Sequence, residues 1–214
     1  MGALAVGAGI AGLHSLTRTS DYRAWGKLRR RGRSTVATLA EGTPVKLIGR
    51  ITPGEPSLTA PLSGRPCVAW RIVVRGKYKI PGTKYPSELR FEIEDRSTDR
   101  LVIDDGTGVA TIEPDPGRFL LIHRNQTRPL HDVPLDRLLA LTARRGYASP
   151  TIDFWEEGVL LAGDEIVVGG LPMREPAPEA PADERGYRDA PAMCWHLRGS
   201  AEHPVRICDQ PSGF

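Results

Sequence analysis

Short stretches in which apolar and polar residues alternate, separated by Gly and Pro, constrain the fold of this chain most strongly. They occupy residues 44–52, 67–80, 88–95, 100–114, 117–123, 163–172, 191–200 and 203–209. A two-residue period is typical of strands with one buried face, and 23 Gly and 19 Pro supply the turns. The pattern predicts a mainly-β chain, and we expect a small antiparallel OB-like β-barrel with one or two short helices and an N-terminal helix.

The sequence "DDGTG" predicts a tight turn within this set of strands. Asp105, Gly106 and Gly108 tolerate the positive φ of a hairpin, so residues 101–103 are expected to pair with residues 109–112. A calcium loop is the alternative interpretation of the carboxylates. Such a loop needs oxygen donors at alternate positions and a Glu at the twelfth, and this spacing does not supply them.

Three segments are expected to lie outside the regular strands. Residues 132–146 have the pattern of an amphipathic helix, with Asp132 as the N-cap and Gly146 after the last turn. Residues 153–157 are expected to form one helical turn leading into a strand, with Glu156 and Glu157 at its solvated end. Adjacent helical residues do not share a face, so these two carboxylates are not expected to act as an acid–base pair. Residues 174–185, rich in Pro and acidic residues, are expected to form an exposed loop.

The N-terminal residues differ in charge from the rest of the chain. Residues 1–16 carry no charge, and residues 1–33 together hold seven basic residues and one acidic residue, a net charge of +6. The pattern predicts a membrane anchor that leaves a domain of residues 34–214 on the cytoplasmic face. An ordinary N-terminal helix in a cytoplasmic protein is the alternative. "GAGIAG" matches a dinucleotide-binding motif in letters only, because no strand precedes it and no acidic residue follows at the required distance, so no cofactor is expected.

The three cysteines do not form a recognisable framework for a disulfide or for zinc. Cys194 and His196 lie one residue apart on the same face of an expected strand, but no second pair of ligands has a customary spacing. Cys67 follows Pro66 at the start of a strand and has no neighbouring base that could activate a thiolate. It is interpreted as a core residue, and the chain is expected to be neither a metalloprotein nor an enzyme.

Four segments in order carry a resemblance to a known family. They are "APLSGRPCVAWRIVV", "FEIEDRSTDRLVIDDGTGVATIEPD", "FWEEGVLLAGDEIVVGGLP" and "GYRDAPAMCWHLRG". Residues 44–209 resemble the GIDE domain, also called the Beside-A-Membrane domain, which implies a membrane-tethered accessory β-domain. The motif residues that this resemblance marks as structural are Ser63, Gly64, Pro66, Cys67, Asp105, Gly108, Glu157, Gly163 and Asp164. The ubiquitin ligase of the family has a RING finger with eight zinc ligands, which this chain lacks, so ligase activity does not transfer.

One insertion between strands forms a candidate binding patch. Its members are Arg71, Arg75, Lys77, Tyr78, Lys79, Lys84 and Tyr85. Cations interleaved with aromatic residues suit anionic lipid headgroups or single-stranded nucleic acid, and a solvated hairpin is the plain alternative. We expect a non-catalytic, membrane-proximal module that binds a membrane surface, a membrane protein or another, unknown protein partner. Nucleic acid is the less favoured alternative, because residues 34–214 have a net charge of −3 and aromatic residues make up only 6% of the chain.

Overall fold

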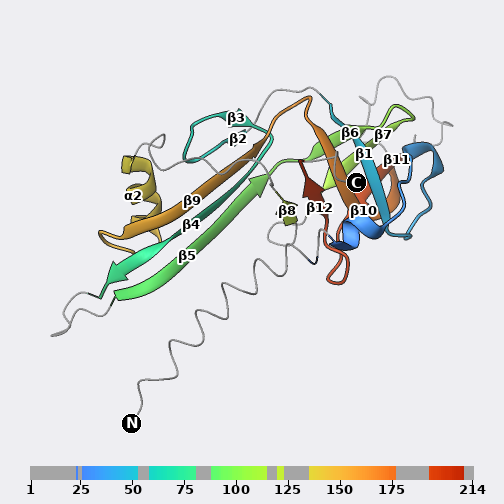
Figure 1. The fold of residues 1–214 in the computed structure, drawn as a ribbon. Coiled ribbons are helices and arrows are strands. Elements are labelled where there is room, and N and C mark those ends of the chain that lie inside the picture. The colour runs from blue at the N-terminus through green and yellow to red at the C-terminus, as the bar shows by residue number, and fades with distance from the viewer. Residues whose placement is uncertain are drawn as a thin grey trace, which may run out of the picture. The chain divides into compact units, whose positions relative to one another are not determined.

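A computed structural model describes residues 23, 26–52, 58–80, 88–114, 120–122, 135–176 and 193–209 of the chain, which is mainly β (Figure 1). The chain divides into two compact units. Unit 1 comprises Met1–Arg23, Pro56–Ser97 and His123–Leu161, and unit 2 comprises Ala24–Glu55, Thr98–Ile122 and Ala162–Phe214. Within the described residues, no helix combines the length and the apolar character that a membrane crossing requires. The uncharged segment 1–16 lies outside the described residues.

Unit 2 contains one seven-stranded sheet. Its elements are the 3-10 helix η1 (Val36–Thr38) and strands β1 (Val45–Ile51), β6 (Leu101–Asp104), β7 (Val109–Glu113), β8 (Leu120–Ile122), β10 (Glu165–Pro176), β11 (Met193–Arg198) and β12 (Arg206–Cys208). The strand order is β1-β6-β7-β11-β10-β12-β8, and β1 also pairs with β10. Five strands therefore follow one another in a cycle, in which β7 and β11 are parallel and the other pairs are antiparallel.

The alternation in the sequence explains the core of unit 2. In β6 and β7 every second side chain is buried, whereas residues 166–170 of β10 are buried without interruption. The fully buried side chains include Leu47, Ile103, Ile112, Val168 and Leu197. The expected hairpin is confirmed, because Leu101 lies opposite Ile112 and Ile103 opposite Ala110. Burying one face of each strand removes a large apolar area from water, which is the main driving force for this arrangement.

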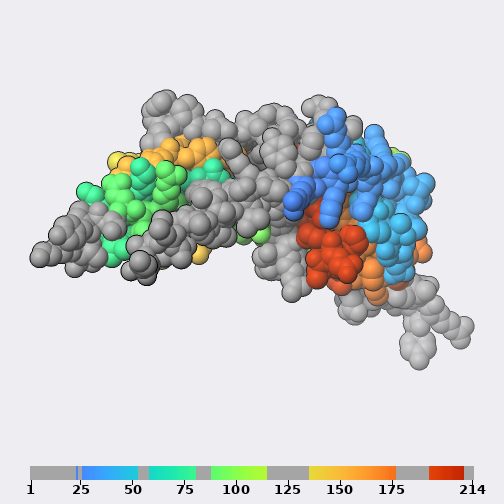
Figure 2. All heavy atoms as spheres, turned by 60° about the horizontal axis from the view of Figure 1, so that its bottom comes forward, coloured from blue at the N-terminus to red at the C-terminus, as the bar shows by residue number. Residues whose placement is uncertain are grey.

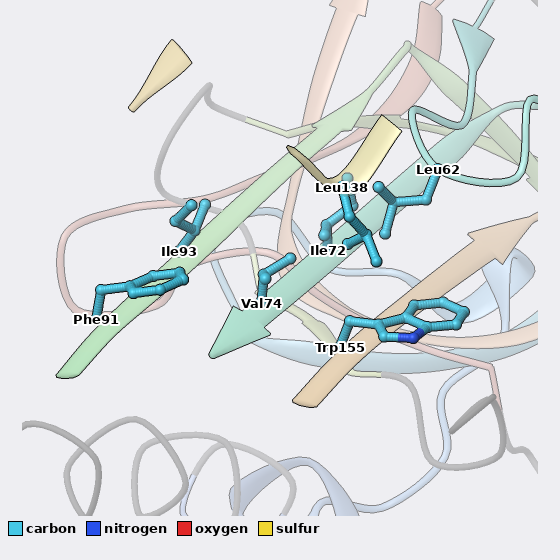
Figure 3. Close-up of a cluster of buried hydrophobic side chains, with 7 residues drawn as sticks. All are labelled: Leu62, Ile72, Val74, Phe91, Ile93, Leu138 and Trp155. Atoms are coloured by element: carbon cyan, nitrogen blue, oxygen red, sulfur yellow. The ribbon is translucent and has the colours of Figure 1, made fainter. Parts of the chain in front are cut away.

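Unit 1 is a three-stranded sheet covered on one face. Its elements are β2 (Leu58–Thr59), β3 (Pro66–Cys67), β4 (Ala69–Lys79), β5 (Glu88–Thr98), β9 (Thr151–Leu160) and helix α2 (Leu135–Arg144). The strand order is β5-β4-β9, and β2 pairs with β3 separately. Figure 3 shows the side chains that converge between the sheet, α2 and the turn before β3, namely Leu62, Ile72, Val74, Phe91, Ile93, Leu138 and Trp155. The helix expected at 132–146 is present over the described residues 135–144.

Two expectations from the sequence are wrong. Residues 153–157 belong to strand β9, which pairs with β4 along most of its length, so they do not form a helical turn. Glu157 is 5% exposed and does not lie at a solvated end. Arg174–Pro176 continue β10 and pair with β11, so the expected loop cannot begin at Arg174. Residues 177–185 lie outside the described part of the chain.

Candidate functional site

The predicted patch on β4 is largely neutralised by the neighbouring strand β5. Arg71 Nε lies 3.1 Å from Glu94 Oε1, and Arg75 Nε lies 3.3 Å from Glu92 Oε2. The Arg75 guanidinium also lies over the Phe154 ring, 5.0 Å from its centroid. Because each of these arginines faces a glutamate, this side of the sheet carries little net positive charge.

The other members of the patch are placed differently. Tyr78 makes edge contacts with Phe91 and Tyr147, at centroid distances of 6.4 and 5.0 Å, and so belongs to the core of unit 1. Lys77 is half-buried and Lys79 is exposed. Lys84 and Tyr85 lie outside the described residues. Among the described members, only Lys77 and Lys79 therefore remain as candidate contacts for an anionic partner.

Glu157 connects the two motifs of the family resemblance in unit 1. Its carboxylate accepts hydrogen bonds from the backbone N–H groups of Leu62 (2.7 Å) and Ser63 (2.9 Å). Arg137 Nη1 donates to the Leu62 carbonyl oxygen at 3.0 Å. Gly64 has a φ of +71°, which favours glycine, and a Cβ there would lie 2.6 Å from Arg137 Nη1. Glu157, Ser63 and Gly64 therefore hold the turn that leads to Pro66 and Cys67.

Cys67 is part of an apolar cluster. Its side chain is fully buried together with Ala60 and Val159, and it lies opposite Leu58 in the short β2–β3 pair. A buried thiol in apolar surroundings behaves as a small hydrophobic side chain. The described surroundings of Cys67 support its interpretation as a core residue.

The "DDGTG" turn binds the segment that precedes β1. Asp105 Oδ2 accepts a hydrogen bond from the Val36 N–H (2.8 Å), and Thr107 Oγ1 accepts one from the Ala37 N–H (3.2 Å). A Cβ on Gly108 would lie 2.9 Å from Val36 Cγ1, so glycine permits this close approach. At the C-terminal end of β1, the Ile51 carbonyl oxygen accepts a hydrogen bond from the N–H of Gly163, and the Ile51 N–H donates to the Asp164 carbonyl oxygen. The motif residues of unit 2 thus fix the segment that precedes β1 and the C-terminal end of β1.

Replacing Asp105 by asparagine is expected to reduce stability in a pH-dependent way. Burial alone raises the pKa of Asp105, but hydrogen bonds from Thr107, Val36 and Gly108 outweigh it and hold the pKa below its ordinary value. A lowered folded-state pKa stabilises the protein above the unfolded-state pKa of about 3.9, and this contribution is lost as the pH falls through the folded-state value. We expect Asp105→Asn to lower the free energy of unfolding by about 1–2 kcal/mol at neutral pH. Urea denaturation at neutral pH and near pH 3 measures this loss in the free energy of unfolding and its dependence on pH.

The matched control for this measurement is Asp99→Asn, which makes the same charge change at a half-buried carboxylate of unit 2. It should leave the free energy of unfolding nearly unchanged at both pH values. A deficit of Asp105→Asn that stays constant down to the acid limit would contradict the role of the carboxylate.

A histidine–carboxylate network that the sequence did not indicate lies on the outer face of the β7–β11–β10 strands. His196 is 2% exposed, and its Nδ1 lies 3.1 Å from Glu113 Oε1 and 3.9 Å from Glu175 Oε2. Arg198 donates to both glutamates, at 2.8 Å from Glu113 Oε2 and 2.7 Å from Glu175 Oε1. Burial alone raises the pKa of Glu113, but hydrogen bonds from Arg198 and His196 hold it below the ordinary value.

This network has the residue types of a metal site, since its ligand atoms lie within 4.8 Å of one another. The Arg198 guanidinium, however, already binds the carboxylate oxygens that a metal ion needs. The geometry therefore favours an ion-pair network. Within the described part of the chain, this group consists of Glu113, Glu175 and His196 and does not include Cys194, the other half of the Cys-x-His pair.

Five cations in the segment that precedes η1 make a stronger candidate surface. We call residues 26–33 the basic arm; they include Lys27, Arg29, Arg30, Arg31 and Arg33 and no acidic residue. Residues 26–30 are helical, and Leu28 is buried to 2% exposure. The Ser34 N–H donates to the Lys46 carbonyl oxygen at 2.8 Å, just before the contacts of the "DDGTG" turn begin. The basic arm is therefore held on unit 2 at Leu28 and at Ser34, the residue that follows it, with Lys27, Arg29, Arg30 and Arg33 exposed.

A hollow of about 340 Å³ lies beside the basic arm in unit 2. It is lined by Arg33, Ile48, Gly49, Arg50, Asp104, Asp105, Gly106 and Glu165. The lining combines cations and carboxylates and includes no Ser, Cys or His that could act as a nucleophile or base. We therefore place the candidate binding surface on the basic arm itself.

Comparisons with known proteins assign neither a family nor a function to this chain. No family model, no curated protein and no solved structure matches this chain.

Proposed function

We propose that this protein is a non-catalytic, membrane-proximal binding module of the GIDE type, whose basic arm contacts anionic lipid headgroups on the cytoplasmic face of a membrane. The observation that carries the proposal is the fixed position of the basic arm. Each basic residue near an anionic membrane contributes about 1 kcal/mol of attraction. Anchoring these cations at Leu28 and η1 reduces the conformational entropy that is lost when they bind.

The fold that we propose for unit 2 is an OB-like barrel. Two features support this barrel. One is the cycle of five strands, β1-β6-β7-β11-β10, and the other is the parallel pair β7–β11. The resemblance to the GIDE domain supports the membrane-proximal placement. This resemblance rests on motif residues, and the structure shows that these residues hold turns and the end of a strand.

Single-stranded nucleic acid is the less favoured ligand. Its binding sites combine cations with exposed aromatic side chains on which bases stack. Every described aromatic side chain is buried or half-buried, and Trp195 is covered by the Arg174 guanidinium at 5.1 Å. Binding to anionic lipid headgroups requires positive charge but no aromatic surface for stacking, and the basic arm supplies that charge.

Vesicle binding tests the proposal. The full chain is expected to bind vesicles rich in phosphatidylglycerol more tightly than pure phosphatidylcholine vesicles. In Lys27→Glu/Arg30→Glu/Arg33→Glu, partitioning onto the anionic vesicles should fall about 100-fold or more, because at least three attractive contacts are lost. Sedimentation of the vesicles with bound protein measures the partition coefficient.

The matched control reverses three cations of unit 1, in Arg65→Glu/Lys77→Glu/Lys79→Glu. This variant has the same net charge as the arm variant, so it separates a local contact from a general charge effect. The proposal is overturned if the control loses binding while the arm variant binds as the wild type does. Equal binding to both vesicle types, or an oligonucleotide that displaces the vesicles from the wild type at equal phosphate concentration, would also overturn it.

A further inference from the structure

Two buried cations lie beneath the basic arm on one face of the unit 2 sheet. Lys46 in β1 is opposite Gly169 in β10, and Gly169 is opposite Arg206 in β12, so the three residues share a face across three strands. A Cβ on Gly169 would lie 2.6 Å from Leu28 Cδ1, which shows that Leu28 sits directly over this glycine. In Figure 2 the blue N-terminal residues of unit 2 lie against its red C-terminal residues on this face.

Lys46 and Arg206 differ in their hydrogen-bond partners. Lys46 is 5% exposed, and its Nζ donates to the Arg29 carbonyl oxygen at 3.4 Å. Arg206 is 7% exposed, and its Nε is buried without a hydrogen-bond partner. The Arg31 N–H donates to the Leu28 carbonyl oxygen at 3.3 Å, and Leu28 lies over Gly169, where a Cβ would be 3.9 Å from the Arg206 Cβ. This places the backbone of Arg31 close to Arg206, and burial and the positive charge of Arg31 both lower the pKa of Arg206. No ion pair joins Arg206 to a carboxylate among the described residues.

A buried guanidinium Nε–H without an acceptor is unfavourable, and a second cation close to the same guanidinium increases the cost. An anion between the two arginines would accept the hydrogen bond of the buried Nε–H group and would offset the repulsion between the two positive charges. Guanidinium groups bind phosphate oxygens through pairs of parallel N–H···O hydrogen bonds, and a tetrahedral phosphate can accept such bonds from two arginines.

We propose that Arg206 and Arg31 together bind one phosphate group, with Arg206 contributing from the sheet and Arg31 from the basic arm. The group is a phosphate monoester or diester, carried by a lipid headgroup or by a soluble molecule. The lipid source rests on the proposed membrane function, whereas the phosphate site itself does not.

Thermal unfolding of the full chain in phosphate and in chloride, at equal ionic strength, tests the site. At about ten times the dissociation constant, inorganic phosphate should raise the wild-type Tm by about 3 °C or more above the chloride value. Arg206→Met should abolish this increase. In chloride its Tm should equal or exceed that of the wild type, because the substitution removes an unpaired buried charge while keeping a long apolar side chain.

Arg31→Met provides a second variant in case Arg206→Met does not fold, and it should also lose the phosphate response. Arg33→Met, an exposed cation two residues further along the chain, should keep the response. The proposal is overturned if phosphate stabilises the wild type no more than chloride does. It is equally overturned if the responses of Arg31→Met and Arg33→Met are the same.

Partitioning of Arg206→Met, or of Arg31→Met, onto phosphatidylglycerol vesicles separates the two sources of phosphate. Partitioning about 10-fold weaker than that of the wild type, together with competition by glycerol phosphate, supports a lipid headgroup in the site. Unchanged partitioning with a lost phosphate response supports a soluble phosphate. The arm variant Lys27→Glu/Arg30→Glu/Arg33→Glu keeps both arginines, so its phosphate response should persist although its vesicle binding falls. A wild type that responds to phosphate but binds both vesicle types equally supports the phosphate site and contradicts the membrane function.

Discussion

Replacing Glu157 by glutamine is expected to lower the free energy of unfolding of unit 1 by about 3 kcal/mol. The buried carboxylate accepts two backbone hydrogen bonds, from Leu62 and Ser63. A glutamine side chain has one acceptor oxygen and one donor group, so one of the two N–H groups would face another donor. The Leu62 N–H group is buried and the Ser63 N–H group is partly buried, so the loss of either hydrogen bond is costly and the turn before β3 would lose its support.

Chemical denaturation, followed by the fluorescence of the buried Trp155, measures this change. Asp153→Asn is the matched control, because Asp153 is an exposed carboxylate of the same strand, β9. Its free energy of unfolding should remain within about 0.5 kcal/mol of the wild type. A loss of less than about 1 kcal/mol in Glu157→Gln would show that the carboxylate does not support the turn.

The second large effect is expected at Gly49, where strands β1 and β6 approach each other closely. A Cβ at this position would collide with the backbone carbonyl oxygen of Asp104 and would lie 2.9 Å from Ile103 Cγ1. Backbone atoms of paired strands cannot move aside as the end of a flexible side chain can. Gly49→Ala is therefore expected to lower the free energy of unfolding by about 3 kcal/mol, at the upper end for one extra methyl group in a packed core.

Gly32→Ala is the control for this substitution. No atom lies within 4 Å of the position where its Cβ would be placed, so the added methyl group should change the stability little. Calorimetric unfolding of both variants compares them directly. If Gly49→Ala unfolds at the wild-type temperature, β1 and β6 are not packed as closely as the structure places them.

The sequence predicted most of the strands correctly because their signal is local. Alternation along residues 45–50, 88–94 and 101–112 identified the buried faces, and the positive φ tolerated by glycine located the hairpin turn. The role of Gly49 could not be predicted in the same way. Its place in the alternation marks it as inward-facing, but the close approach of Asp104 depends on how two strands far apart in the sequence are paired.

The roles of charged residues were harder to predict, because they depend on partners in other strands. Glu157 follows another glutamate, a pattern that favours a solvated position, and only the turn before β3 supplies the N–H groups that permit its burial. Arg71 and Arg75 belong to a basic segment of the sequence. Their neutralising glutamates, Glu92 and Glu94, alternate on the next strand, so cross-strand pairing was a signal that could have been used.

The contacts of Arg206 and His196 also depend on strand pairing. His196 meets Glu113 because β11 runs parallel to β7, and Arg206 lies beneath the basic arm because β12 pairs with β10. Neither pairing follows from local sequence patterns. The basic arm itself was visible in the sequence as a charge asymmetry, although its attachment to unit 2 through Leu28 was not.

A fluorescent label at residue 32 reports whether the basic arm is the surface that contacts an anionic membrane. Gly32→Cys, in a background with the half-buried Cys194 replaced by serine, places the label on an exposed position of the arm, and Lys79→Cys places it on unit 1. Phosphatidylglycerol vesicles with a quencher on their headgroups are then added. We predict strong quenching at residue 32 and little at residue 79; quenching at residue 79 alone would contradict membrane contact through the basic arm.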